Sequence, residues 1–182
     1  MSESSTVLEI DRSHAWNLIL EKKVSLFNPK RTWDNPLSEK LKKIDLSQVL
    51  LLPLVLGGVM PSDLTQDSFN QSILKQLDDY QAQGYVLLDG GIVASMLSHS
   101  EMIPPLWSEI TDSDSYDENK ATIRFDGSVF AISDRTEEFI LKPFTTRGHW
   151  GFGFGSRLPK LAVSNRDKDI LSKEFTAVLP QG

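Results

Sequence analysis

The sequence predicts an α+β fold in which an antiparallel sheet packs against helices. Before about residue 83, apolar side chains recur at three- and four-residue spacing, which is typical of helices that bury one face. Between residues 121 and 154 the spacing changes to two residues, interrupted by short turn signals, which is the pattern of strands joined by hairpins. We therefore expect one domain spanning residues 1–182, in which a four-stranded antiparallel meander at about 121–154 packs against helices from the N-terminal half and a C-terminal helix.

Composition narrows the class of protein and its compartment. With 182 residues, 40% of them hydrophobic and 24% charged, the chain has the composition of an ordinary soluble globular domain. It has no cysteine, which excludes disulfides, thiolate metal sites and a cysteine nucleophile. The longest apolar run, residues 49–60, is shorter than the roughly 20 residues of a membrane-spanning helix. Residues 1–12 lack the pattern of a secretory signal. We expect a cytoplasmic protein that does not enter a membrane.

The first third of the chain predicts two helices and one ambiguous apolar segment. The first helix begins near Ser13 and ends before Pro29, because the residue before a proline avoids the helical region. Its buried stripe is expected to contain Trp16, Leu20, Val24 and Phe27. A second, shorter helix is expected over residues 37–44. Residues 49–60 are compatible with either a buried strand or a buried helix, as short apolar runs usually are.

The clearest helix runs from Ser62 or Asp67 to Gln83. Gly84 follows it, at the position where a left-handed residue commonly ends a helix. The predicted inner stripe is Phe69, Ile73, Leu74, Leu77 and Tyr80. Residues 85–88 (YVLL) then predict a strand. The following segment, IVASML, fits a strand or a helix. The Asp89-Gly90-Gly91 segment after this strand is compatible with an anion-binding loop, but a hairpin or a simple turn is favoured.

The predicted meander rests on turn signals between four apolar segments. Asp126-Gly127 alone separates ATIRF from SVFAIS, which is a strong local signal for a two-residue hairpin turn. The third and fourth strands are expected at residues 138–144 and 149–154. Near the C-terminus, a helix is expected to begin at Ser164 or Asn165 and to end at Pro180. Its predicted stripe is Ile170, Leu171, Phe175 and Val178.

Negative charge is concentrated in the middle third of the sequence. Residues 61–120 hold eleven Asp and Glu against two Lys, whereas residues 1–60 hold seven against eight Lys and Arg, and residues 121–182 hold seven against nine. The net charge is −6. Such a distribution repels nucleic-acid phosphates and attracts basic surfaces, although the same charges also serve simply to solvate a surface. Nucleic acid is therefore disfavoured as the direct ligand.

This charge pattern favours a non-enzymatic interaction protein of bacterial or viral type, such as an inhibitor, an immunity protein or an accessory subunit. Its acidic surface, residues 63–118, is expected to engage a basic partner protein. Tryptophan and tyrosine are the aromatic anchors that binding surfaces prefer. The side chains expected to contact the partner are Trp107, Asp112, Asp114, Tyr116, Asp117 and Glu118.

The segment GHWGFGFGSR, residues 148–157, raises a second possibility. Its glycines fit neither the dinucleotide pattern GxGxxG nor the Walker pattern, and strict two-residue alternation indicates a strand. One face would be aromatic and the other bare, so a ring, a helix or neighbouring backbone is expected to pack on the glycines. The alternative is a small enzyme or ligand-binding domain with a groove formed by Arg147, His149, Gly151 and Gly153.

Catalytic and metal motifs are weak. His149 is the best acid–base candidate, on the hypothesis that Asp126, Asp134 or Glu138 orients it. The acidic stretch at 112–118 begins like a calcium loop, but the residues at the fifth, sixth and twelfth positions do not fit one. The three histidines show no metal-ligand spacing. We expect neither a metal nor a cofactor.

Overall fold

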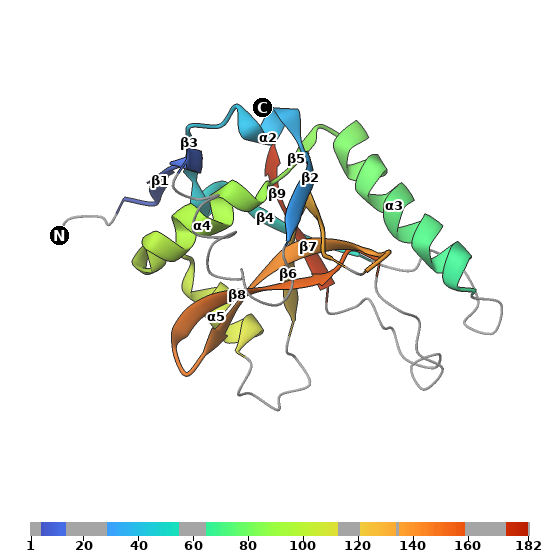
Figure 1. The fold of residues 1–182 in the computed structure, drawn as a ribbon. Coiled ribbons are helices and arrows are strands. Elements are labelled where there is room, and N and C mark those ends of the chain that lie inside the picture. Colours follow the sequence, from blue (N-terminus) through green and yellow to red (C-terminus); the bar gives the residue numbers. More distant parts are fainter. Residues whose placement is uncertain are drawn as a thin grey trace.

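The computed structural model describes residues 5–13, 29–54, 65–112, 121–133, 135–158 and 174–181. It confirms a mixed α+β fold (Figure 1). In the described part of the chain, seven strands form one sheet, with β4, β9, β6, β7 and β8 in that order, while β2 pairs with β6 and β5 pairs with β9. These strands are β2 (Lys30–Asp34), β4 (Leu50–Pro53), β5 (Tyr85–Leu87), β6 (Thr122–Ala131), β7 (Glu138–Thr146), β8 (His149–Ser156) and β9 (Glu174–Pro180). The sheet is mixed, because β6 and β9 are parallel and the other pairs are antiparallel.

The predicted meander is three strands long rather than four. β6, β7 and β8 follow one another antiparallel, but the proposed hairpin at Asp126-Gly127 is wrong: both residues lie inside the continuous strand β6. Asp126-Gly127 instead marks the place where β6 changes neighbours. Thr122–Arg124 pairs with β9, whereas Ser128–Ala131 pairs with β2, and the register against β7 shifts between Phe125 and Phe130.

The predicted C-terminal helix is also wrong over its described part. Glu174–Pro180 is strand β9, which lies between β6 on one side and β4 and β5 on the other. Its residues alternate between the two faces of the sheet, so that Ala177 joins one apolar cluster and Val178 the other. Both faces of β9 are therefore buried, and its apolar residues, whose spacing also fits a helix, are those of a strand covered on both sides. Residues 159–173 lie outside the described residues.

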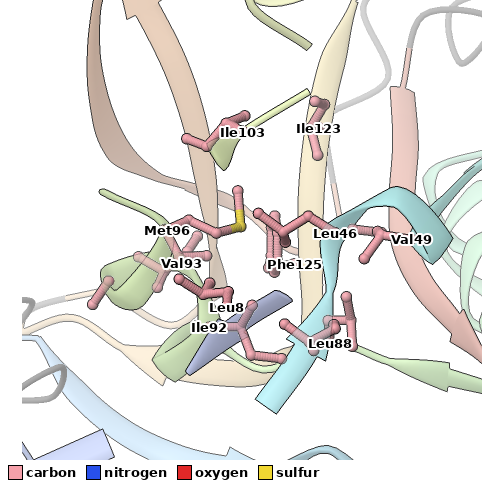
Figure 2. Packing of buried hydrophobic residues seen from close by; sticks show 14 of the residues in the cluster. Leu8, Leu46, Val49, Leu88, Ile92, Val93, Met96, Ile103, Ile123 and Phe125 are labelled. Carbon is pink, nitrogen blue, oxygen red and sulfur yellow. The ribbon is translucent and has the colours of Figure 1, made fainter. Parts of the chain in front are cut away.

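The sheet carries an apolar cluster on each face. The larger cluster joins α4 (Gly90–Ser98) and α5 (Pro105–Thr111) to β6 and to the N-terminal strand β1 (Val7–Glu9). Figure 2 shows Met96 of α4 pointing toward Phe125 of β6, with Leu8 and Leu46 around them. The smaller cluster forms where α3 (Gln66–Ala82) packs on β5 and β9. Short elements complete the described chain: α2 (Pro36–Glu39), β3 (Lys43–Asp45), η1 (Leu46–Gln48) and η3 (Ser100–Met102).

Helix α3 matches its prediction closely because its signals are local. Thr65 caps its first turn reciprocally with Ser68, and Gly84 follows its end with φ +92°. Its buried stripe is Phe69, Ile73 and Leu77, at helical spacing, with Tyr80 half-buried beside them. The strand expected at YVLL is β5, and IVASML is helical in α4. No helix in the described ranges is long and apolar enough to span a membrane.

The N-terminal half differs from its prediction in more than one place, and part of it lies outside the described residues. Lys30–Asp34, expected as a loop between two helices, forms strand β2. The short helix expected at 37–44 is shorter, because α2 ends at Glu39 and Lys43–Asp45 forms β3, antiparallel to β1. The ambiguous run at 49–60 begins as strand β4. The helix expected from Ser13 falls on residues 14–28, outside the described residues, as do residues 55–60 of that run.

Asp45 gives the β1–β3 pair a measurable dependence on pH. Its carboxylate accepts hydrogen bonds from the Ser47 hydroxyl (2.6 Å), the Thr6 hydroxyl (2.7 Å) and the Ser47 amide (3.0 Å), and these hold the pKa of Asp45 below its ordinary value. A lowered pKa in the folded state contributes stability above the pKa of the unfolded chain, about 3.9, and that contribution is lost as pH falls through the folded value. We expect a carboxyl-carbon NMR titration to place Asp45 below that unfolded value and Thr6→Val to raise its pKa. An Asp45 that titrates above pH 4 in the unmodified protein would contradict this assignment.

Candidate functional site

The acidic third of the chain does not form one surface in the described residues. Asp67, Asp78 and Asp79 are exposed on α3, whereas Glu109 and Asp112 belong to α5 and the residue after it. Figure 1 places α3 and α5 on opposite sides of the molecule. Asp79 also forms an ion pair with Lys75 across one helical turn (2.6 Å). Glu101 of η3 (Ser100–Met102) is a further exposed carboxylate, so the negative charge of the described acidic third is spread over α3, η3 and the end of α5.

Two of the predicted partner-binding residues, Trp107 and Asp112, lie on α5 or directly after it, and burial is incompatible with the surface role predicted for Trp107. Trp107 is only 4% exposed and belongs to the larger apolar cluster, so it is a core residue and not a surface anchor. Asp112 is half-buried and pairs as an isolated bridge with Thr145 of β7. The apolar side chain that α5 does expose is Leu106, which is 60% exposed. The other predicted contacts, Asp114, Tyr116, Asp117 and Glu118, lie outside the described residues.

The glycine-rich strand β8 has the two faces that its alternation predicts. Trp150, Phe152 and Phe154 pack against the larger cluster, and Phe154 meets Phe130 edge-on with ring centroids 5.1 Å apart. On the opposite face the Phe144 ring of β7 covers two of the glycines: a methyl group added to Gly151 or Gly153 would meet that ring at 3.6 to 3.9 Å. The bare face is thus covered by a neighbouring aromatic ring, as the packing interpretation expected.

The groove predicted around His149 is not supported by its neighbours. Arg147 and Gly148 form the two-residue turn between β7 and β8 with φ of 50° and 77°, so Arg147 and His149 are exposed at that tip. The carboxylates proposed to orient His149 are elsewhere: Asp126 is buried against Arg124, and Glu138 pairs with Arg157 at the far end of the β7–β8 ladder. Asp134 lies outside the described residues. The acid–base role given to His149 therefore loses its two described partners.

A pocket of about 370 Å³ opens at the opposite end of the same ladder. Gly153 is the one residue of the predicted ligand site that lines it. The remaining lining comes from the β6–β7 connection, the start of β7 and the end of β8: Ile132, Arg135, Glu137, Phe139, Phe154 and Ser156. The structure therefore separates Arg147 and His149 from the cavity that Gly153 borders.

The structure contains a buried ion cluster that was not predicted from the sequence. The Arg124 guanidinium donates to both carboxylate oxygens of Asp126 (2.7 and 3.3 Å), to Glu174 of β9 (2.9 Å) and to the Arg157 carbonyl (2.6 Å). Lys142 of β7 donates to the other Glu174 oxygen (3.1 Å). Arg124 and Asp126 are fully buried side chains, two positions apart on β6 and so on one face of it. That i, i+2 pairing of opposite charges was the signal available in the sequence.

The charges in this cluster balance, with two cations facing two carboxylates. Burial by itself lowers the pKa of Arg124, but the charges of Asp126 and Glu174 and their hydrogen bonds outweigh it, so that the pKa is raised above its ordinary value. Arg124 therefore stays charged. A cluster whose donors and acceptors satisfy one another connects β6, β7, β9 and the end of β8, and it leaves no reactive group poised for chemistry.

A second polar cluster sits under the start of α4. The Asp89 carboxylate is buried and accepts from Arg12 (2.9 Å), from the Ser38 hydroxyl (2.5 Å) and from the Gly91 amide (3.0 Å). The Gly90 amide donates to Ser128 of β6 (2.9 Å). The amides of the Asp89-Gly90-Gly91 turn are thus occupied by the protein's own side chains, which favours the simple turn over an anion-binding loop.

Among the described residues, no group of three or more His, Cys, Asp or Glu side chains is arranged to hold a metal ion. No protein-family model, curated protein or solved structure matches this chain.

Proposed function

We propose that this chain is a protein-interaction module without catalytic activity, which engages a basic partner protein through acidic side chains. The observation that supports this proposal is that the buried and the exposed charged groups of the chain have different surroundings. The buried ones, in the Arg124 and Asp89 clusters, are paired with one another and serve the fold. Asp67 and Asp78 of α3 are exposed and available to a partner, and Asp79 beside them is exposed and paired with Lys75.

The geometry of α3 favours it as the contact surface. The helix buries one narrow stripe, Phe69, Ile73 and Leu77, on β5 and β9, whereas its acidic residues Asp67, Asp78 and Asp79 are exposed. Asp67 and Asp78 are eleven residues apart, which is close to three helical turns, so they lie on the same side at a separation of about 16 Å. Asp79 adds a third carboxylate next to Asp78. Acidic groups spaced in this way suit a basic surface that spans several side chains, and such complementarity chiefly sets encounter rate and partner choice.

Charge reversal on α3 tests the proposal. We expect Asp67→Lys with Asp78→Lys to reduce capture of the basic partner from an extract of the native host by about tenfold or more. We also expect capture by the unmodified protein to weaken as salt rises from about 0.05 to 0.5 M, because exposed charges are screened. The retained proteins would be identified and quantified by mass spectrometry. Asp112→Lys with Asp114→Lys provides the same test for the second acidic region.

The control has the same change in net charge at other sites. Glu9→Lys with Glu39→Lys alters exposed carboxylates on β1 and α2, and we expect it to retain the partner. His149→Ala should also leave capture unchanged, whereas an activity or ligand centred on His149 would be lost. If both acidic regions tolerate reversal as well as the control does, the proposed function is wrong.

A further inference from the structure

The pocket at the β6–β7 end of the sheet combines an aromatic floor with a charged rim. Phe139 and Phe154 both pack against the larger apolar cluster, yet each remains half-buried and lines the cavity. Ile132 closes the apolar wall. Two aromatic rings that pack against the core and also line a cavity offer it apolar, aromatic surface, which favours an aromatic ligand group.

The polar groups at the rim differ in how firmly they are held. One oxygen of Glu137 accepts a hydrogen bond from the Ser156 hydroxyl (2.9 Å), while the other lies 3.9 Å from Arg135. That ion pair is loose, and the Arg135 side chain is 59% exposed, so the pair contributes little and the guanidinium retains donors for another acceptor. Glu137, in contrast, is fixed by Ser156. Arg135 is therefore the rim group best able to turn to a ligand.

Positive charge continues beyond the pocket. Ile132 also borders a neighbouring hollow of about 330 Å³, whose other lining residues are Pro29, Lys30, Ala131 and Ser133. Lys30 is exposed there at the start of the edge strand β2. A ligand that lies on Phe139 and Phe154 thus has Arg135 in its own pocket and Lys30 in the hollow next to it. Glu137 also lines the pocket, but its carboxylate is already engaged by Ser156, so this arrangement favours an anion over a cation.

We propose that this pocket binds a small planar aromatic anion, an aryl carboxylate of one or two fused rings. The ring lies on Phe139 and Phe154, and the carboxylate accepts hydrogen bonds from Arg135, for which guanidinium and carboxylate geometries are matched. The volume is at the lower end of the range for small-molecule pockets, which limits the ligand to this size. This ligand site is separate from the acidic surface of α3 and does not depend on the proposed partner.

Binding of three nearly isosteric compounds to the full chain tests this site: indole-3-carboxylate, the neutral indole-3-carboxamide and the cationic 3-aminomethylindole. We expect the acid to bind about tenfold more tightly than the amide, because a charged acceptor strengthens the hydrogen bond from Arg135, and the amine to bind weakest. Affinities would be measured by titration of amide chemical shifts in NMR spectra. The shifts should be largest at Gly153 and Ser156, which line the pocket.

Two arginine variants separate this site from general attraction of anions. Arg135→Gln should reduce the affinity of the acid about tenfold, to that of the amide, and leave the amide unaffected. Arg147→Gln is the matched control, because it removes an exposed arginine at the opposite end of the same strand pair, and it should leave all three affinities unchanged. Equal binding of the three compounds, shifts confined to other residues, or equal losses in the two variants would overturn the proposal.

Discussion

Gly127→Ala is expected to lower the free energy of unfolding by about 3 kcal/mol or more, which is large for the addition of one methyl group. A Cβ at this position would lie 2.4 Å from the Leu87 carbonyl oxygen and 2.4 Å from the Leu88 carbonyl carbon. Both atoms belong to backbone and cannot turn aside as a side chain would. Hydrogen bonds hold the β5–α4 connection against β6 at this point. The Gly127 amide donates to the Leu88 carbonyl (2.9 Å), and the Gly127 carbonyl accepts from the Asn35 amide (2.7 Å).

Two other glycines provide matched controls in the same urea-unfolding experiment. Gly148→Ala has open space around the added methyl but places alanine at φ +77°, so we expect a cost of about 1 kcal/mol from backbone strain alone. Gly151→Ala would meet the Phe144 ring at an ordinary 3.8 Å and should change stability by less than about 0.5 kcal/mol. A Gly127→Ala protein as stable as the Gly151→Ala protein would show that the β5–α4 connection does not cross β6 this closely.

Gly127 also explains why the hairpin prediction failed. Asp-Gly between two apolar segments is a hairpin signal because glycine tolerates positive φ, but in the described residues only Arg147, Gly84 and Gly148 have positive φ. Gly127 is needed for a different reason, namely the close approach of another segment of backbone. Asp126 is likewise used as a buried ion-pair partner. Both roles depend on contacts that are distant in sequence, and a local turn signal does not contain them.

The elements that were predicted correctly depend on neighbouring residues alone. Helix α3 has its cap, its stripe and its terminal glycine within one stretch, and β7 and β8 are joined by a two-residue turn at Arg147-Gly148. Strand β9 was missed because its central place in the sheet, and not its own spacing of apolar residues, decides its structure. The same limit applies to function: sequence proximity grouped Trp107 with the acidic residues, but packing moves its side chain into the core.

Arg124→Met is expected to destabilise the protein by about 3–5 kcal/mol, because it leaves the buried Asp126 carboxylate without its cation. Asp126 has no exposed side-chain surface, and Glu174 is only 15% exposed. Since the folded-state pKa of Arg124 is raised, its contribution is fully present below the pKa of the unfolded chain and is lost only as pH rises through the folded value. The pKa values of Arg124 in the unfolded and in the folded chain both lie above the pH range in which stability is measured. The contribution of Arg124 to stability should therefore not vary between about pH 5 and 9.

A double-mutant cycle distinguishes this ion pair from the simple loss of a large side chain. If the cost comes from the unpaired carboxylate, Asp126→Ala introduced into the Arg124→Met protein should recover at least about 1 kcal/mol relative to the sum of the two single changes. Thr176→Val controls for substitution at a buried neighbouring position: Thr176 lies opposite Arg124 on β9, and its hydroxyl is buried without a hydrogen-bond partner among the described residues. Because that hydroxyl is buried and makes no hydrogen bond among the described residues, replacing it with a methyl group should leave stability unchanged or raise it. Strictly additive costs for Arg124 and Asp126 would instead mean that the cluster contributes through packing, and that charge pairing does not hold β6 against β9.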